Sequence, residues 1–218
     1  AAVSFSGSVS ASVSDTAIWP SSGVYFRALE IRFERILLNL SVSTATVILP
    51  GGVVTQKETA DVQLDGEGNF VRDPAVDIVK VAVVERHQRT GNVATAFLRG
   101  YGIKAGAVAL SIAHDSHNLI VVGVDDEEMA FAVEQLRKQE GGIVLVKDGK
   151  VIESMPMPIA GLMNDLPVRE MAELVAKLDA AWKQMGCVIN SPYMTMALVP
   201  LACLPELRLT NRGLVDCR

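Results

Sequence analysis

The sequence predicts an α+β (α/β) fold, in which a mixed, largely antiparallel sheet with hairpins is accompanied by two main helices. Short runs rich in Val, Ile and Leu recur along the chain between turns that contain Gly, Asp or Pro. Some of these turns are tight enough to form antiparallel hairpins. Two longer segments repeat apolar residues at helical spacing, so strands and helices alternate within the chain.

The first 45 residues differ from the rest and form a Ser-rich segment of unclear role. Ser alternates there with small apolar residues, a pattern that fits a weak edge strand and a poorly ordered tail equally well. The chain begins with Ala and its first residues lack the pattern of a secretory signal. We therefore expect a division into residues 1–45 and 46–218, and a chain that is the C-terminal part of something longer.

Strands begin to be well marked at Thr46. The first three are short and form a small meander, with a turn at Pro50–Gly52 and a loop at Asp65–Asn69. Two longer apolar strands follow at Lys80–Val84 and Val93–Leu98. Later strands are predicted at 106–112, 119–124, 143–146 and 151–153, the last two joined by Asp148-Gly149, a preferred pair for a tight primed turn.

The two helices carry recognisable start and stop signals. Asp125 and Asp126 can cap the first helix, whose apolar face comprises Met129, Ala132, Val133 and Leu136. The second runs from about Pro167 to Met185 and ends at Gly186. Its apolar face comprises Met171, Leu174, Val175, Leu178 and Trp182.

Two further apolar segments are candidates for packing in the core or against another surface. The stretch Met155–Met163 combines rigid prolines with adaptable methionines and suits either core packing or a wall against a partner or a flat ring. The surroundings of Pro200 and Pro205 suggest an extended strand that docks on another surface.

Composition excludes several classes of function. A formal net charge of -5 argues against a nonspecific nucleic-acid binder. The apolar stretches are interrupted before the ~18 residues that a membrane helix requires, so no membrane partner is expected. Three cysteines without metal-like spacing indicate a reducing environment, and we expect a cytoplasmic protein.

The turn His114–Asn118 contains two of the three histidines of the chain and lies between two apolar strands. With Asp115 between them and His87 at the end of another strand, the residue types suit a zinc or manganese site, although their spacing is not diagnostic. Ser116 and Asn118 could instead only satisfy backbone groups in a tight turn. A structural turn, a loop that contacts substrate or takes part in catalysis, and a metal site all stay open.

Glu85, Arg86 and His87 close a buried strand, so their side chains emerge where the sheet meets a loop, a common place for binding groups. Adjacent side chains on a regular strand point to opposite faces. We therefore expect Glu85 and Arg86 to have separate partners instead of pairing with each other.

Several of these stretches together resemble one family. They are Val83–His87, Gly100–Gly102, Ala113–Asn118, Pro158–Met163 and Leu207–Thr210. From about residue 46 to its end, the chain is similar to the C-terminal domain of bacterial adenine deaminase, in the amidohydrolase superfamily. The resemblance implies an enzyme that converts adenine and water to hypoxanthine and ammonia in purine salvage. It also implies a metal-dependent (β/α) barrel with a binuclear Mn, Fe or Zn centre, and neither is expected in this chain.

The barrel's metal centre in that family rests on a His-x-His motif, and no such motif occurs in this sequence. The resemblance therefore implies that this chain alone is inactive and binds no metal. Accessory catalytic roles fall to His114, Asp115 and His117, and substrate contacts to Ser116, Asn118, Glu85, Arg86 and His87. The expected partners are the barrel domain, a purine and further copies in a homo-oligomer. The alternative is a non-catalytic structural or oligomerisation module.

Overall fold

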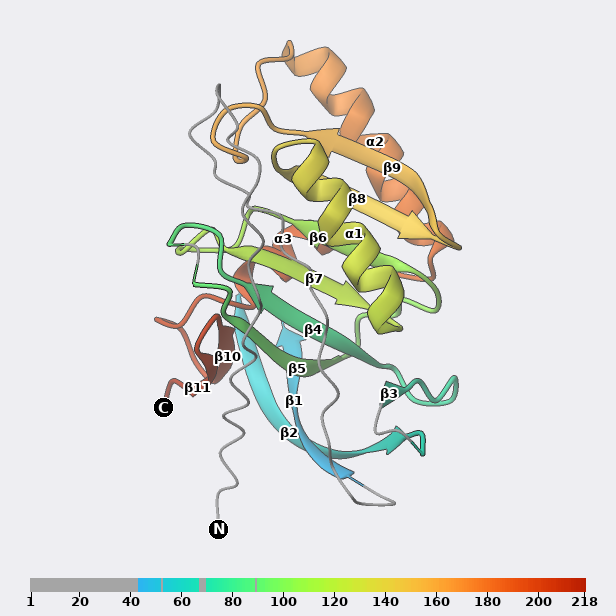
Figure 1. Cartoon of the computed structure of the whole chain (residues 1–218), viewed down its shortest axis with the longest axis vertical. Helices are drawn as coiled ribbons and strands as arrows, with labels where there is room; N and C mark the ends of the chain where they lie inside the picture. Colours follow the sequence, from blue (N-terminus) through green and yellow to red (C-terminus); the bar gives the residue numbers. More distant parts are fainter. Residues whose placement is uncertain (1–42, 52, 67–69, 89) are drawn as a thin grey trace.

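The computed structural model describes residues 43–51, 53–66, 70–88 and 90–218. Within them one open nine-stranded sheet has the order β3-β2-β1-β5-β4-β7-β6-β8-β9 (Figure 1). Its strands are β1 (Ser43–Gly51), β2 (Val54–Leu64), β3 (Phe70–Val71), β4 (Ile78–Val84), β5 (Val93–Arg99), β6 (Ala107–Leu110), β7 (Leu119–Gly123), β8 (Gly142–Lys147) and β9 (Lys150–Pro156). Only the described pair β1 and β5 is parallel, which confirms the mixed, largely antiparallel sheet.

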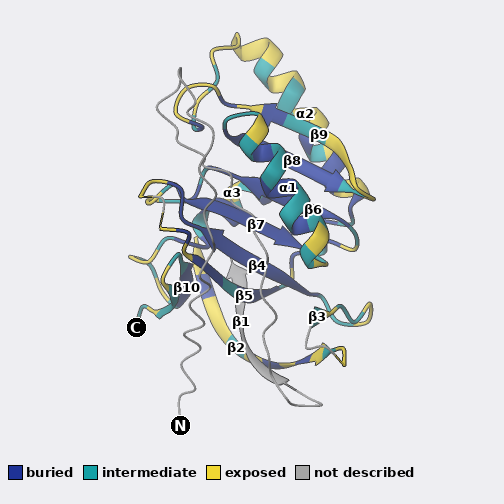
Figure 2. Ribbon diagram, viewed as in Figure 1, coloured by how far each residue is buried: buried dark blue, intermediate teal, exposed yellow. Residues whose placement is uncertain are grey.

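Helices cover both faces of the central strands. The helix α1 (Asp126–Lys138) packs on one face, over β6, β7 and β8. The opposite face is covered by α2 (Val168–Gln184), by the short α3 (Pro192–Leu198) and by the C-terminal hairpin β10 (Leu207–Thr210) and β11 (Gly213–Asp216). Every residue of β4, β6 and β7 is buried, because both faces of these strands are covered (Figure 2).

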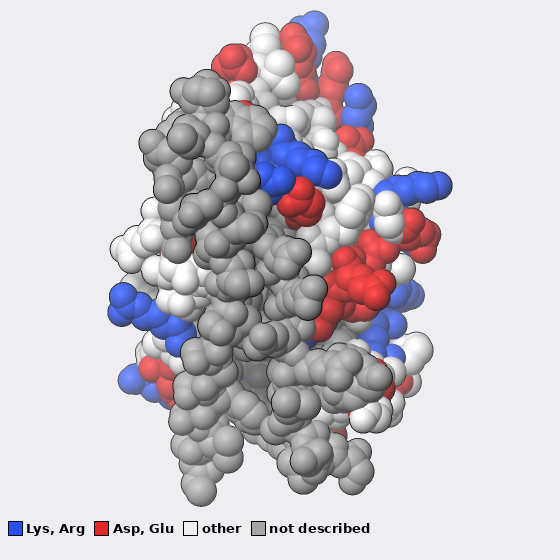
Figure 3. Space-filling view, in the orientation of Figure 1, with Lys and Arg blue, Asp and Glu red and all other residues white. Residues whose placement is uncertain are grey.

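The helix α1 begins and packs as its sequence predicts. The Asp125 carboxylate caps it by accepting the backbone N–H of Glu128 at 2.8 Å, and the four predicted apolar residues are buried. Carboxylates gather at its N-terminal end and basic side chains at its C-terminal end (Figure 3). This arrangement complements the helix dipole. The buried Lys80 of β4 binds Asp126 at 2.7 Å and so fastens the helix to the sheet.

The predicted β8–β9 hairpin and second helix are also confirmed. Asp148 and Gly149 have φ values of 53° and 67°, as a type I′ turn requires. Leu178 and Trp182 of α2 are buried, whereas Met171, Leu174 and Val175 are only partly buried. None of the helices in the described part of the chain is long and apolar enough to cross a membrane.

Two details of the expected fold are wrong, and one short helix was not predicted. Pro50 and Gly51 do not form the first turn but extend β1, where they pair with Thr55 and Val54. A third helix, α3, follows the two predicted ones. The region between Pro200 and Pro205 is a series of turns instead of an extended strand.

Most of the Ser-rich segment lies outside the described residues. The strand β1 begins at Ser43, so the expected boundary between residues 45 and 46 falls within this strand. The division into 1–45 and 46–218 stays a prediction.

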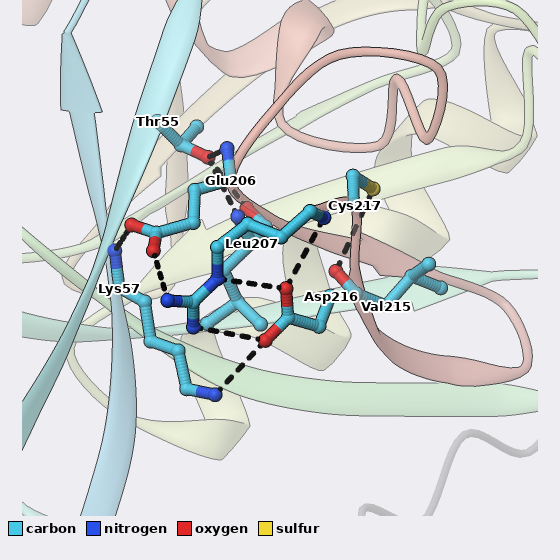
Figure 4. A network of polar contacts seen from close by, with 8 residues as sticks. Thr55, Lys57, Glu206, Leu207, Val215, Asp216 and Cys217 are labelled. Carbon is cyan, nitrogen blue, oxygen red and sulfur yellow. Dashed lines mark hydrogen bonds and ion pairs between the residues drawn. The ribbon is translucent and has the colours of Figure 1, made fainter.

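A polar network fastens the C-terminal hairpin to β2 (Figure 4). The buried Thr55 hydroxyl donates to the Leu207 carbonyl at 2.7 Å and accepts the backbone N–H groups of Glu206 and Leu207, both at 3.2 Å. The Lys57 backbone N–H donates to the Glu206 carboxylate at 2.8 Å, and its ammonium binds Asp216 at 3.1 Å. The C-terminal hairpin is thus fastened to the edge of the large sheet, while its two strands form a separate small sheet.

Candidate functional site

Three loops meet at one end of the sheet, on the left in Figure 1. They follow β4 (residues 85–92), connect β6 to β7 (residues 111–118) and follow β9 (residues 157–167). All eight residues that the sequence predicts for a site lie in the first two loops. Strand ends bring these residues together because β4 and β7 are antiparallel neighbours, with Val84 opposite Leu119.

Arg86 links the three loops. Its side chain is 7% exposed and donates through Nε to the carbonyl of His117 and through Nη2 to the carbonyl of Ala160 at 3.2 Å. Its backbone N–H donates to the Asn118 side chain at 3.2 Å. Burial lowers the pKa of Arg86 from its usual value, but a guanidinium stays protonated in proteins. Arg86 is therefore a cation that holds the loops in place.

Glu85 and Arg86 have separate partners, as expected. The Glu85 carboxylate accepts the backbone N–H groups of His87, Gln88 and Thr90 and the Thr90 hydroxyl. Burial alone raises the pKa of Glu85, but these four donors outweigh it and hold the pKa below its usual value. The carboxylate stays ionised at neutral pH and shapes the turn after β4.

The three imidazoles lie around the β6–β7 turn. The rings of His114 and His117 are edge to face, with centroids 5.5 Å apart. The backbone N–H of His114 donates to the Ala197 carbonyl of α3 at 2.9 Å. The Nε2 of His87 lies 2.6 Å from the Ser116 carbonyl, and because a carbonyl only accepts, this nitrogen carries the proton. We call His87, His114 and His117 the imidazole cluster.

Exposure separates the candidate residues into two groups. His87, Asp115 and Ser116 are exposed, and His114 and His117 are partly exposed, so all five can be reached from outside. Asn118 is 4% exposed and its side-chain oxygen is bound to the Arg86 backbone. Glu85 is equally enclosed by its donors. The geometry gives Glu85, Arg86 and Asn118 positioning roles, and it leaves the other five able to meet a ligand.

A buried serine that sequence reasoning missed holds the third loop. Ser111 is fully buried, and its Oγ accepts the Gly142 N–H at 2.7 Å and donates to the Gly161 carbonyl. Gly161 has a φ of 72°, and a Cβ there would lie 2.9 Å from Arg86 Nη1. The available signal was a serine that ends an apolar strand, together with the Gly141-Gly142 and Ala160-Gly161 pairs.

The environment of His117 lowers its pKa from its usual value. Burial is the main cause, and the nearby His114, Arg86 and His87 add to it against the opposing charge of Asp115. His117 is therefore neutral at pH 7. In a neutral imidazole, one ring nitrogen donates a hydrogen bond and the other accepts one.

We expect the free energy of unfolding to fall as the pH decreases from 7 through about 6.5, the ordinary pKa of histidine. Between that value and the lower folded-state pKa of His117, the unfolded chain binds more protons than the folded chain, so acid favours unfolding. Urea unfolding at pH 7.5, 6.5 and 5.5 measures the effect. His117→Asn should flatten the dependence, because Asn tolerates the φ of 51° found there. An equal slope in both proteins would contradict the assignment.

Two of the possible metal ligands in the site, His87 and Glu85, already have other partners. Among the residues that the structure describes, no three or more His, Cys, Asp or Glu side chains are grouped to hold a metal ion. The Nε2 of His87 contacts the backbone carbonyl of Ser116. The Glu85 carboxylate oxygens accept hydrogen bonds from N–H and hydroxyl donors.

These features define the described part of the chain as an open-sheet α+β domain with an imidazole cluster at one end of its strands. Residues 52–218 match the family described as the adenine deaminase C-terminal domain. The chain belongs to this family.

Curated relatives agree with this assignment. An adenine deaminase of Clostridium botulinum (strain ATCC 19397 / Type A) is 60% identical over 145 residues, which are 66% of this chain and 24% of that protein. Adenine deaminase 2 of Desulfotalea psychrophila is 50% identical over 88% of this chain and 34% of its own length. An adenine deaminase of Moorella thermoacetica is 48% identical, covering 89% and 30% respectively. The chain thus spans a quarter to a third of the length of these relatives.

Proposed function

We propose that this chain is the C-terminal part of an adenine deaminase, a cytoplasmic hydrolase that converts adenine and water to hypoxanthine and ammonia in purine salvage. The match of residues 52–218 to the C-terminal domain family carries this proposal. The names and greater length of the relatives support it. The free state of Cys187, Cys203 and Cys217 agrees with a reducing compartment.

In this proposal the catalytic metals, a binuclear Mn, Fe or Zn centre, belong to a barrel domain outside this chain. The absence of His-x-His from the sequence supports that division. This chain alone would then be inactive. Its own contribution is a set of polar groups held at one end of a rigid sheet.

The imidazole cluster is the part of the chain that we propose to face the purine. Ring nitrogens of adenine accept hydrogen bonds and its amino group donates them, so the neutral imidazole of His117 suits both. The backbone of His114 is held by α3 and that of His117 by Arg86, so the turn that carries both imidazoles is ordered before the substrate binds. Asp115 and Ser116 are exposed beside them and can bind polar edges of the same ligand.

The test is a full-length enzyme in which this chain replaces the C-terminal domain of the Clostridium botulinum relative. We expect His114→Ala and His117→Ala each to lower kcat/KM for adenine by about 10- to 100-fold, the effect of losing one good hydrogen bond in the transition state. Gln88→Ala, on the exposed neighbouring loop, is the matched control and should keep full turnover. Unchanged turnover in both histidine variants would remove the catalytic role of the cluster.

A structural or oligomerisation module is the second candidate, favoured by the way Asn118 and Arg86 close the turn on itself. In that case the histidine variants would lose melting temperature or change the solution mass of the proposed homo-oligomer while keeping their rate constants. Both quantities can be measured on the same samples.

A further inference from the structure

The turn at Pro158–Met163 holds two large apolar side chains outside the core. Ile159 is 44% exposed and Met163 is 58% exposed. Their backbones pair in a short antiparallel bridge, with each N–H donating to the other residue's carbonyl at 3.1 Å. Directly paired residues project their side chains to the same face of a ribbon. Ile159 and Met163 therefore form one continuous apolar surface, here called the apolar turn.

Buried groups hold the apolar turn rigidly. Arg86 donates to the Ala160 carbonyl at 3.2 Å, and Ser111 donates to the Gly161 carbonyl. Beyond the turn, the Asn164 side chain donates to the Pro156 carbonyl at 2.6 Å. A rigid apolar surface loses little conformational entropy when a partner covers it, which is how preorganised contacts gain affinity.

Two more exposed apolar residues follow in the sequence toward α2. Leu166 is 39% exposed and Val168, the first residue of α2, is 87% exposed. Meanwhile Met155 and Met157 are buried in the core, so the Met155–Met163 stretch divides into a core half and an outward half. Single exposed apolar residues are common on protein surfaces, but contiguous ones indicate an interaction site.

The apolar turn and the imidazole cluster lie at the same end of the domain. Arg86 contacts the carbonyls of both His117 and Ala160, so one side chain joins the two features. The loop that carries the apolar turn and the loop that carries His114 and His117 are therefore within the reach of one side chain.

We propose that the apolar turn is the surface on which this domain docks against the metal-bearing part of the adenine deaminase, an inference that rests on the proposed function. The matched relatives extend well beyond this domain, since the alignment covers only 24% to 34% of their lengths.

The partner surface that fits is an apolar depression with polar groups at one rim. The depression would take Ile159 and the adaptable Met163, and the rim would face the imidazole cluster. Docking in this way would place His114 and His117 at the entrance to the neighbouring active site. It assigns the apolar turn a role in positioning, not in chemistry.

The test uses the same full-length chimera. Ile159→Ser with Met163→Ser is compared with Val151→Ser with Ile152→Ser on the edge strand β9, where the exposures of 43% and 37% are similar. We expect the β9 control to unfold in one thermal transition like the parent. The apolar-turn variant should split into two transitions and be cleaved faster by protease between its two parts. Met163→Gln, which keeps the side-chain length but not its apolar character, should give the same change in weaker form.

The outcomes distinguish docking from the proposed function. One shared transition in the apolar-turn variant would overturn the docking proposal, even if His114→Ala still lowers turnover. Two transitions together with full turnover in both histidine variants would support docking and remove the catalytic role of the cluster. A halved solution mass with one shared transition would mean that a second copy covers the apolar turn, and would also overturn the proposal.

Discussion

Replacing Arg208 by alanine will lower the free energy of unfolding by about 3–5 kcal/mol, the range for removing a large buried side chain whose partners lose their hydrogen bonds. Arg208 is fully buried in β10. Its guanidinium donates to four carbonyls, those of Leu204, Leu198, Val53 and Pro205, at 2.6 to 3.0 Å. Leu198 is the last residue of α3, where carbonyls lack helical partners and carry partial negative charge.

Urea denaturation of the purified chain measures this loss. Arg208→Lys should recover only a part of the stability, because an ammonium cannot reproduce the planar arrangement of donors in a guanidinium. Arg212→Ala, an exposed arginine in the β10–β11 turn, is the control and should change stability by less than about 0.5 kcal/mol. A loss below about 1 kcal/mol in Arg208→Ala would show that water replaces the guanidinium at the four carbonyls.

Gly142→Ala will destabilise the chain by about 3–5 kcal/mol, the sum of backbone strain and overpacking. Gly142 opens β8 with a φ of 111°, and a Cβ there would lie 2.0 Å from the Met155 carbonyl oxygen of β9. The atoms that this Cβ would meet belong to the backbone of Met155 and Met157, which cannot move aside as a flexible side chain would. The pair Gly142–Pro156 would have to separate, and the Ser111 contact with the Gly142 N–H would be lost with it.

Gly213→Ala separates the two contributions to this loss. Gly213 has a similar φ of 117°, but nothing lies within 4 Å of a Cβ at that position. It should cost only the backbone strain, about 1–3 kcal/mol. Equal losses in the two variants, measured by thermal and urea unfolding, would show that the collision at Gly142 relaxes without cost.

Features set by local residues could be predicted from the sequence. Three examples are the Asp125 cap, the Asp148-Gly149 turn and the apolar face of α1. Each depends on residues that are close together in the sequence. The helix α3 could not be predicted in this way. It has seven residues, and the side chain of Ser191 before it makes no capping hydrogen bond. Tertiary contacts stabilise it instead, since the Tyr101 hydroxyl donates to the Pro192 carbonyl.

The candidate site shows the same division. The imidazole cluster and the Glu85–His87 segment could be identified because polar residues follow buried strands. Their relation to the apolar turn could not, since Arg86 and Ala160 are 74 positions apart and Ser111 and Gly161 are 50 apart. Periodicity carries no information about such pairs, which depend on how β6 comes to lie between β7 and β8.

The fastening of β2 to the C-terminal hairpin has a consequence for synthesis on the ribosome. Thr55 and Leu207 are 152 positions apart, so the hydroxyl of Thr55 meets its partners only when nearly the whole chain has been made. At about 5–20 residues per second, that delay is roughly 8–30 s. The hairpins β8–β9 and β1–β2 can each close soon after they emerge, whereas the outer edge of β2 around Thr55 stays uncovered during this interval. We therefore expect the β1–β2 end to be the part of the nascent domain that most needs chaperone protection.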